Sequence, residues 1–230
     1  MYEIEVKLHF PKATVLELQN SLAKIIQNWT PPITQIDTIY LSKNMTEYKI
    51  IEGTKIVRIR EEQNKTDNVK QILTMKIQQE TKLSSLEYET EISDSKAVSK
   101  MIEAWDFVEF VCVEKTRQKA KYGDYNFCLD TVKDLGLFLE IELLSSSKLD
   151  SKSAQDKIIS FIETYNLPAY RLNDVPYDTQ VFNKKSAKKA VFNKILPIKL
   201  FLTKFKLKIV AIFSHFSLKI TFVVLVNCRR

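Results

Sequence analysis

The sequence predicts a mainly β fold of the α+β class, built from antiparallel strands that each carry one charged face. The first observation is the start of the chain, where Glu3, Glu5 and Lys7 alternate with apolar residues, which is the two-residue period of a strand. The second is that this alternation recurs, each time with charges of one sign. The third is composition: 3 glycines, 6 prolines and 45% hydrophobic residues suit a packed domain and not a low-complexity chain.

Acidic and basic alternations occupy different segments of the chain. A single alternating strand has a simpler interpretation as the solvated outer face of a sheet. A solvent-facing sheet usually mixes the two signs, however, and separated carboxylates and cations suit a site that holds metal ions beside a polyanion. The acidic runs carry Glu87, Glu89 and Glu91 and then Glu140 and Glu142, and the basic runs carry Arg58 and Arg60, then Lys76, then Lys115, Arg117 and Lys119.

The first predicted elements are a strand over residues 2–9 and a helix over residues 12–28. The strand follows from the alternation described above. The helix follows from apolar residues at helical spacing, beginning with Val15 and Leu18, and the Pro-Pro pair at 31–32 ends this unit.

The sequence between residues 34 and 165 predicts seven further strands and two helices. Each strand segment alternates or is rich in β-branched and aromatic residues. A helix over 94–105 is expected because Ser93 or Asp94 can cap its first turn, and a helix over 150–165 offers Ile158 and its neighbours for packing. The strands are expected near 34–41, 54–62, 70–79, 86–93, 107–121, 124–132 and 137–144, with a polar hairpin at 62–69.

The net charge of +7 is divided unevenly along the chain. Residues 1–178 contain 23 Lys and Arg against all 28 Asp and Glu, a net of −5, whereas residues 179–230 contain 12 Lys and Arg and no acid. The basic balance of the whole chain therefore does not indicate nucleic-acid binding. We expect one folded domain over residues 1–178 and a basic, apolar extension over 179–230.

The extension contains a mostly apolar run from Ile209 to Val226, interrupted by His215 and Lys219. This run is at the short limit for a membrane span, and a Lys inside it costs about 3 kcal/mol on insertion scales, so a spanning helix is not favoured. Two interpretations remain. One is a basic anchor to the surface of an anionic membrane, and the other is a sequence outside the selected fold, such as an out-of-frame extension.

The cysteines and histidines exclude other kinds of metal or redox site. Cys112, Cys128 and Cys228 are scattered without metal-ligand spacing, as expected of free thiols in a reducing cytosol. His9 and His215 are too few and too separate for a histidine site, which leaves carboxylates to bind a hard cation. Acidic residues interrupt any apolar run at the N-terminus, so no secretory signal is expected. We expect a cytoplasmic protein, with membrane association through the extension as the alternative.

A series of charged motifs occurs in a fixed order between about residue 2 and residue 178. The motifs are Glu3-x-Glu5-x-Lys7, Gln35-x-Asp37-Thr38-x-Tyr40, Val57-Arg58-Ile59-Arg60-Glu61, Leu73-Thr74-Met75-Lys76, Glu87-x-Glu89-x-Glu91, Lys115-x-Arg117 and Leu129-Asp130-x-Val132-x-x-Leu135-Gly136-x-Phe138-x-Glu140-Ile141-Glu142. In this order they resemble the CYTH superfamily, the triphosphate tunnel metalloenzymes, whose N-terminal signature is Glu-x-Glu-x-Lys. The ordered set is far more specific than the first motif alone.

The resemblance implies an architecture: a closed antiparallel eight-stranded β-barrel that forms a tunnel with a charged lumen, with helices packed outside. Closure removes the exposed strand edges and gives ions a lumen. Periodicity alone also allows an open sheet with helices on one side.

The resemblance also implies the site residues. A triphosphate needs several cations at fixed positions and a metal at the reacting phosphoryl group. The implied triphosphate-binding cations are Lys7, Arg58, Arg60, Lys76, Lys115 and Arg117. The implied ligands of Mg²⁺ or Mn²⁺ are Glu3, Glu5, Glu87, Glu89, Asp130, Glu140 and Glu142, although Glu87 and Glu89 have the alternative role of pairing with the arginines. The implied catalytic residues are Lys7, Lys76 and Tyr177, the last from Val175-Pro176-Tyr177-Asp178, which meets the family pattern loosely.

We therefore expect a metal-dependent enzyme that acts on the phosphoanhydride of a nucleoside or organic triphosphate, such as ATP or thiamine triphosphate. Hydrolysis is favoured because water needs no positioned ribose. The alternative is a class IV adenylyl cyclase that converts ATP to cyclic AMP and pyrophosphate. The Gln35 and Lys115 motifs resemble that branch, although Ser84 and Ser85 stand where its members often carry Arg.

Two non-enzymatic alternatives stay open at this point. One is a binding module for polyphosphate, and the other is a membrane-tethered or nucleic-acid-binding protein driven by the basic extension. For the favoured enzyme, the expected partner is a small triphosphate and no nucleic acid. The resemblance also implies a homodimer as an oligomeric state.

Overall fold

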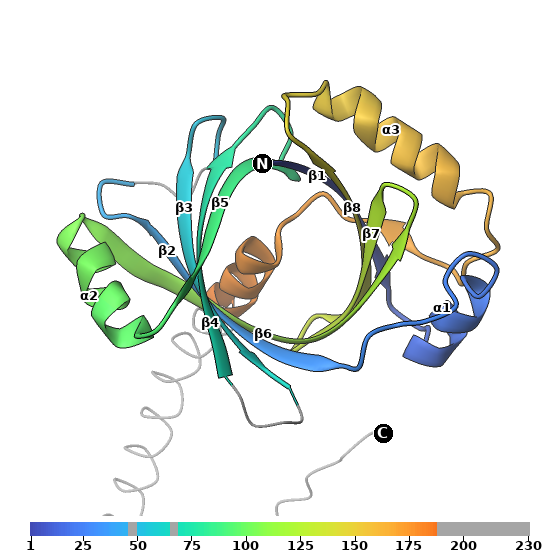
Figure 1. Cartoon of the computed structure of the whole chain (residues 1–230), viewed down its shortest axis with the longest axis horizontal. Helices are drawn as coiled ribbons and strands as arrows, with labels where there is room; N and C mark the ends of the chain where they lie inside the picture. Colours follow the sequence, from blue (N-terminus) through green and yellow to red (C-terminus); the bar gives the residue numbers. More distant parts are fainter. Residues whose placement is uncertain (46–49, 65–68, 188–230) are drawn as a thin grey trace, which may run out of the picture. The chain divides into compact units, whose positions relative to one another are not determined.

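The computed structural model describes residues 1–45, 50–64 and 69–187, and residues 1–183 form one compact unit. Its centre is an antiparallel barrel in the strand order β5-β4-β3-β2-β6-β7-β8-β1, closed by pairing of β1 with β5 (Figure 1). The predicted mainly β, closed eight-stranded barrel is therefore confirmed. The strands are β1 (Tyr2–Phe10), β2 (Ile33–Ser42), β3 (Lys55–Gln63), β4 (Val69–Gln78), β5 (Ser84–Ile92), β6 (Phe107–Tyr122), β7 (Tyr125–Val132) and β8 (Gly136–Ser145).

The closing contact joins strands that are far apart in the sequence. Glu3 of β1 lies opposite Ser85 of β5, while the same strand pairs along its whole length with β8. A ninth strand, β9 (Arg171–Leu172), which the sequence did not predict, pairs with Leu8 and His9 of β1 outside the ring. The first strand is thus held by three partners, which fixes the position of its charged face.

Three helices pack outside the barrel: α1 (Val15–Ser21), α2 (Ser95–Ala104) and α3 (Ser151–Ile162). Asp94 caps α2 as predicted, accepting hydrogen bonds from two backbone N–H groups. The predicted helix over 12–28 is too long. It begins after a Thr14–Glu17 capping box and ends at Ser21, and Leu22 then reaches the core from an irregular turn.

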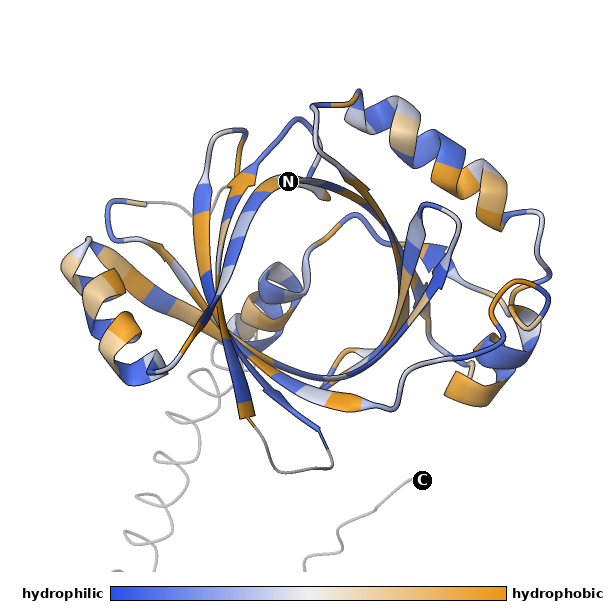
Figure 2. Ribbon diagram, viewed as in Figure 1, coloured by the Kyte–Doolittle hydropathy of each residue, from blue (hydrophilic) through white to orange (hydrophobic). Residues whose placement is uncertain are grey.

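Two hydrophobic clusters join these helices to the outer face of the barrel. The larger packs α1 and α3 on the outer sides of β1, β7 and β8, around Leu8, Leu139 and Ile158. The smaller packs Ile102 of α2 against Val57 and Ile59 of β3. Polar and apolar residues alternate along the strands (Figure 2), so the apolar outer face and the helices together form the main core.

A third cluster lies inside the barrel at one end of the lumen. It consists of apolar side chains on the inner faces of β2, β3, β6, β7 and β8, together with residues of a helix at 177–187 that the sequence did not predict. We call this cluster the apolar floor, and its members are Ile39, Leu41, Ile56, Val111, Val113, Val132, Phe138, Tyr177 and Val181. Part of the lumen is therefore a packed core, and the charged part is confined to the rest.

Two expectations fall largely on residues outside the described part of the chain. The polar hairpin at 62–69 includes residues 65–68, and the extension at 179–230 includes residues 188–230. The division at residue 178 stays a prediction. Within the described ranges, no helix has both the length and the hydropathy needed to cross a bilayer.

Candidate active site in the barrel lumen

The register of the barrel brings charged residues of neighbouring strands to the same inner face. Residues directly opposite each other in an antiparallel pair point to the same side. The opposed pairs include Lys7 with Glu140 and Glu5 with Glu142, Asp37 with Arg60, Lys76 with Glu87 and Arg117 with Asp130. The alternating charges of the sequence thus meet across strands that are far apart in the chain.

These side chains surround a cavity of about 760 Å³. Its lining includes all six predicted triphosphate-binding cations, the three apolar residues Ile39, Ile56 and Val113 of the floor, and Tyr177. Six of the seven predicted metal ligands also line it. The seventh, Asp130, is fully buried behind the side chains of Arg117 and Lys115.

Lys7 lies between two carboxylates at the centre of the site. Its Nζ is 3.1 Å from Glu5 Oε1 and 3.1 Å from Glu140 Oε1, and the side chain is 2% exposed. Burial works to lower the pKa of Lys7, but the two carboxylates outweigh it and raise the pKa above its ordinary value. The ammonium group therefore stays charged at neutral pH.

Arg117 connects three carboxylates. Its Nε donates to Asp130 Oδ1 at 2.7 Å, its Nη2 contacts Asp130 and Glu140, and its Nη1 is 3.5 Å from Glu142 Oε1. Burial works to raise the pKa of Glu140, but Lys7 and Arg117 hold it well below the usual range. Glu140 is therefore an anion even though it is buried.

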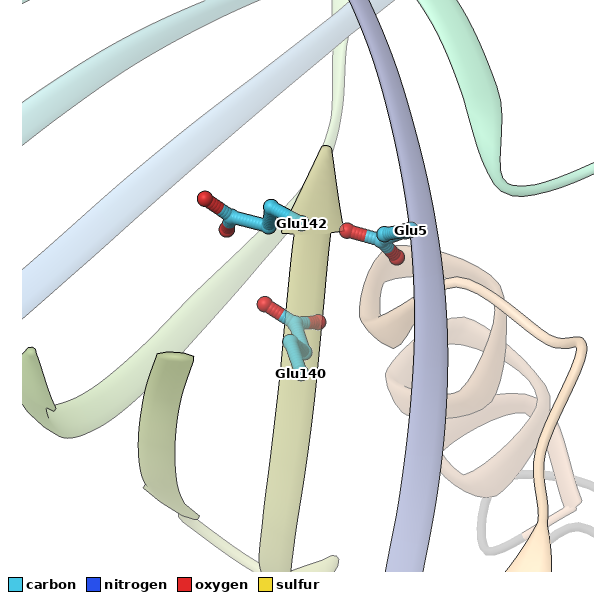
Figure 3. A group of neighbouring side chains, drawn as sticks. All are labelled: Glu5, Glu140 and Glu142. Carbon is cyan, nitrogen blue, oxygen red and sulfur yellow. The ribbon is translucent and has the colours of Figure 1, made fainter. Parts of the chain in front are cut away.

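Glu5, Glu140 and Glu142 form an acidic cluster. One carboxylate oxygen of each lies within 4.8 Å of the others, and Figure 3 shows Glu5 on β1 beside Glu140 and Glu142 on β8. Burial raises the pKa of Glu5, with repulsion from Glu140 adding to the effect. Without a bound cation, Glu5 is therefore harder to ionise than an exposed glutamate. Three oxygen donors of this kind fit a hard divalent cation such as Mg²⁺ or Mn²⁺.

A second group lies where β1 meets β5. Lys76 Nζ is 3.2 Å from Glu3 Oε1 and also contacts Glu87, whose carboxylate accepts a hydrogen bond from Ser85 at 2.8 Å. Burial raises the pKa of Glu3 well above its ordinary value, whereas Lys76 outweighs burial at Glu87 and lowers its pKa to about 2. Lys76 therefore pairs with both carboxylates, and Glu87 is the more readily ionised of the two.

Glu89 is more exposed to solvent than Glu87, and about half of its side chain is accessible. Its Oε2 is 3.5 Å from Arg58 Nη2 and accepts a hydrogen bond from Thr74 at 3.0 Å. Among the described residues, Glu89 and Glu87 both contact cations, and neither belongs to the acidic cluster. This geometry supports the alternative role for both, pairing with cations.

Asp37 is a site residue that belongs to one of the sequence motifs, but no role was predicted for it. Its carboxylate accepts two hydrogen bonds from Arg60, from Nε at 2.6 Å and from Nη2 at 2.8 Å. Cys128 was missed too. It lines the cavity, and its thiol donates to Glu142 Oε1 at 3.3 Å. Its position could have been predicted from the alternation Asn126-x-Cys128-x-Asp130, because this spacing puts Cys128 on the same face of the strand as Asp130.

The Asp37–Arg60 pair predicts a pH dependence of stability. Burial opposes ionisation of Asp37, but Arg60 outweighs it and holds the pKa of Asp37 well below its ordinary value. A depressed pKa contributes stability above the unfolded pKa of about 4, and this contribution is lost as pH falls below it. The difference in unfolding free energy between the native chain and Asp37→Asn should therefore be constant from pH 7 to about pH 5 and shrink towards pH 3. Urea titrations at each pH measure it, and a pH-independent difference would contradict the expectation.

Tyr177 joins the apolar floor to the charged centre. Its ring lies 4.2 Å from Lys7 Nζ and 5.1 Å from Lys115 Nζ, and it packs edge-on against Phe138 with ring centroids 5.0 Å apart. The Tyr177 hydroxyl is buried and has no hydrogen-bond partner among the described residues. Burial raises the pKa of Tyr177 well above its ordinary value, so the hydroxyl keeps its proton and can donate a hydrogen bond.

Comparison with known proteins agrees with this barrel. Residues 1–171 match the CYTH domain family. No curated protein sequence matches the chain. Among solved structures, the PH1819 protein of Pyrococcus horikoshii is similar with 22% identity, 79% of this chain and 99% of that chain covered, and a TM-score of 0.64.

Two further solved structures have names that refer to an activity. A candidate adenylate cyclase of Vibrio parahaemolyticus is similar with 16% identity, 77% and 95% coverage of this and that chain, and a TM-score of 0.60. The candidate adenylyl cyclase HpAC1 of Hippeastrum, described as having a dominant triphosphatase activity, has 16% identity, 80% and 95% coverage, and a TM-score of 0.53. At these identities the similarity shows the shared fold.

Proposed function

The chain belongs to the CYTH domain family, and from the charged cavity of its barrel we propose that it is a divalent-metal-dependent enzyme that hydrolyses the phosphoanhydride bond of a triphosphate. The observation that carries the proposal is that the acidic cluster of Glu5, Glu140 and Glu142 shares one cavity with six buried or half-buried cations. A metal and a polyanion need these two kinds of group side by side.

The acidic cluster is suited to the metal. Its donors are carboxylate oxygens, which Mg²⁺ and Mn²⁺ prefer. Burial raises the pKa of Glu3 and of Glu5, with repulsion from neighbouring carboxylates adding to it, and a bound cation would offset both effects. Glu3 lies two residues before Glu5 on the same face of β1. When bound, the metal would neutralise charge on the reacting phosphoryl group.

The cations are held in position before any substrate binds. Lys7 and Arg117 lie beside the acidic cluster, and Arg60 is held by its two bonds to Asp37. Groups fixed in this way need little rearrangement to stabilise charge that develops on the phosphates. In the proposed reaction the oxygen of water bonds to the terminal phosphorus and the bond from that phosphorus to the bridging oxygen breaks. The bridging oxygen leaves on the diphosphate part of the substrate, the attacking water loses a proton to the solvent, and orthophosphate is released.

Hydrolysis is proposed over cyclisation because it requires fewer groups to be held in position. Cyclisation requires a ribose held with its 3′-hydroxyl at the α-phosphate. Tyr177 is the sole aromatic residue among the described residues that line the cavity, and it lies at the apolar floor. The similarity of fold to the Hippeastrum protein with its triphosphatase activity also supports hydrolysis.

Product analysis tests the proposal. The purified full-length chain is incubated with Mg²⁺ or Mn²⁺ and, separately, with ATP, thiamine triphosphate or inorganic tripolyphosphate. Release of orthophosphate is expected, and the fastest substrate identifies the preferred class. Cyclic AMP with pyrophosphate as the main products from ATP would instead identify a class IV adenylyl cyclase. Binding of all three ligands without any product would favour the non-catalytic polyphosphate-binding module.

Tyr177 should contribute to substrate binding through its hydroxyl. Because that group has no partner within the described structure, Tyr177→Phe should leave the melting temperature unchanged. It should raise the KM about tenfold or more, since a hydrogen bond to a charged group is worth about 1.5–3 kcal/mol. Tyr177→Leu is the matched comparison and should also lower stability, because it removes the ring that packs on Phe138. An unchanged KM in the Phe variant would contradict this role.

A further inference from the structure

The cations that line the cavity differ in whether a carboxylate lies beside them. Eight of the ten lie within 4.0 Å of a carboxylate oxygen: Lys7, Arg58, Arg60, Lys70, Lys76, Lys82, Lys115 and Arg117. In the described part of the chain, Lys119 and Lys121 have no such partner. These two lysines are neighbours on the inner face of β6, so their positive charge is concentrated at one place.

The position of Lys119 and Lys121 follows from the register of β6. Lys119 lies opposite Cys128, which lines the cavity, and Lys121 lies opposite Asn126, which also lines it. Along the strand they continue the inner-face series that begins in the apolar floor with Val113 and passes through Lys115 and Arg117. From Lys115 to Lys121 this row of four cations extends about 20 Å.

The two ends of the row differ in exposure. Val113 and Lys115 are buried, whereas Lys119 and Lys121 are exposed. The apolar floor fills the inner end of the lumen, so a polyanion whose terminal phosphate reaches Lys7 and Arg117 extends away from the floor. Lys119 and Lys121 line the cavity in that direction. The loop before β2 borders the same mouth, since Thr30 receives a hydrogen bond from the backbone N–H of Lys119 at 2.8 Å and lines the cavity.

We propose that Lys119 and Lys121 form an outer anion subsite that binds phosphate groups beyond the first three of a linear polyphosphate. The proposal rests on the proposed function, because it assumes that a triphosphate occupies the cations nearer the floor. Unpaired ammonium groups favour an anion, and Asn28, Thr30 and Asn126, which line the cavity near the two lysines, are polar and uncharged, while Glu142 lies one strand farther, opposite Asn126. They provide no aromatic plane for a nucleobase.

Calorimetric titration of the full-length chain with two probes, inorganic tripolyphosphate and linear pentaphosphate, tests the subsite. The titrations are made in EDTA so that hydrolysis does not consume the probe. Pentaphosphate should bind the native chain more tightly than tripolyphosphate at low salt. The double variant Lys119→Ala, Lys121→Ala should reduce the ratio of the two affinities about 5- to 10-fold, as expected for two exposed charge contacts of up to about 1 kcal/mol each. The reduction should shrink at high salt because exposed charges are screened.

Lys96→Ala, Lys100→Ala is the matched control, because these two exposed lysines lie on α2 and do not line the cavity. It should leave the affinity ratio unchanged. Equal affinity of the native chain for both probes, or an unchanged ratio in the Lys119, Lys121 variant, would overturn the subsite while leaving the proposed function standing. Failure of the native chain to bind either probe in EDTA would overturn the subsite, whereas the proposed function is tested separately by the product analysis with Mg²⁺ or Mn²⁺.

Discussion

Replacing Glu142 by Gln should lower turnover of the triphosphate substrate at least about 100-fold while the chain stays folded. Glu142 belongs to the acidic cluster with Glu5 and Glu140, and Gln removes its charge at nearly constant volume. Loss of even an outer partner of a metal ligand typically costs about 10- to 100-fold in metal affinity or activity. Stability should change little, because Arg117 keeps its contacts with Asp130 and Glu140.

Two measurements separate loss of metal from loss of fold. Titration with Mn²⁺ followed by electron paramagnetic resonance should show weaker binding by Glu142→Gln, and thermal unfolding should be close to that of the native chain. Glu91→Gln is the matched control, since Glu91 is 70% exposed and pairs with Lys70 away from the cluster. Full activity of Glu142→Gln, with Mn²⁺ bound as tightly as before, would remove the basis of the metal assignment. Glu5→Gln should behave like Glu142→Gln.

Replacing Asp130 by Asn should lower the free energy of unfolding by about 3–5 kcal/mol, the usual cost of removing one partner of a buried ion pair. Asp130 is 0% exposed and holds both Arg117 and Lys115, whose Nζ lies 3.3 Å from Oδ2. Without its charge, two buried cations lose their shared partner. The melting temperature should fall by roughly 6–20 °C for a chain of this size.

The same variant distinguishes two roles for Asp130. The sequence motif implies a metal ligand, whereas the contacts with Arg117 and Lys115 favour a residue that positions the cations. A stable Asp130→Asn protein that no longer binds Mn²⁺ would support the first role and contradict the second. Asp156→Asn is the control, because its exposed pair with Lys152 should be worth less than about 1 kcal/mol.

Most of the barrel could be predicted from the sequence because alternation reports which residues share a face of a strand. The eight strands, the capped helix α2 and the charged inner faces follow from patterns within single segments. The end of α1 could not be predicted in this way. Leu22 and Ile26 keep helical spacing, yet Leu22 is buried from a turn and Ile26 from the segment directly after it, because burial can be satisfied without helical backbone.

The sequence by itself determined that this chain forms strands with separate acidic and basic faces, and the family resemblance implied that these faces line a closed barrel. It could not determine depth within the barrel. Val111, Val113, Lys115 and Arg117 alternate in the same way on β6, yet the first two belong to the apolar floor and the last two to the site. Depth depends on how strands from distant parts of the chain are staggered, and on the helix at 177–187 that packs on the floor.

Tertiary structure also decided which carboxylates gather and which hold cations. Glu142 and Asp130 come from one sequence motif, but β1 pairing with β8 places Glu142 opposite Glu5, whereas β6 pairing with β7 places Asp130 opposite Arg117. The charge at each position can be read from the sequence alone. The neighbours that set its pKa and its role come from strands that meet only when the barrel closes.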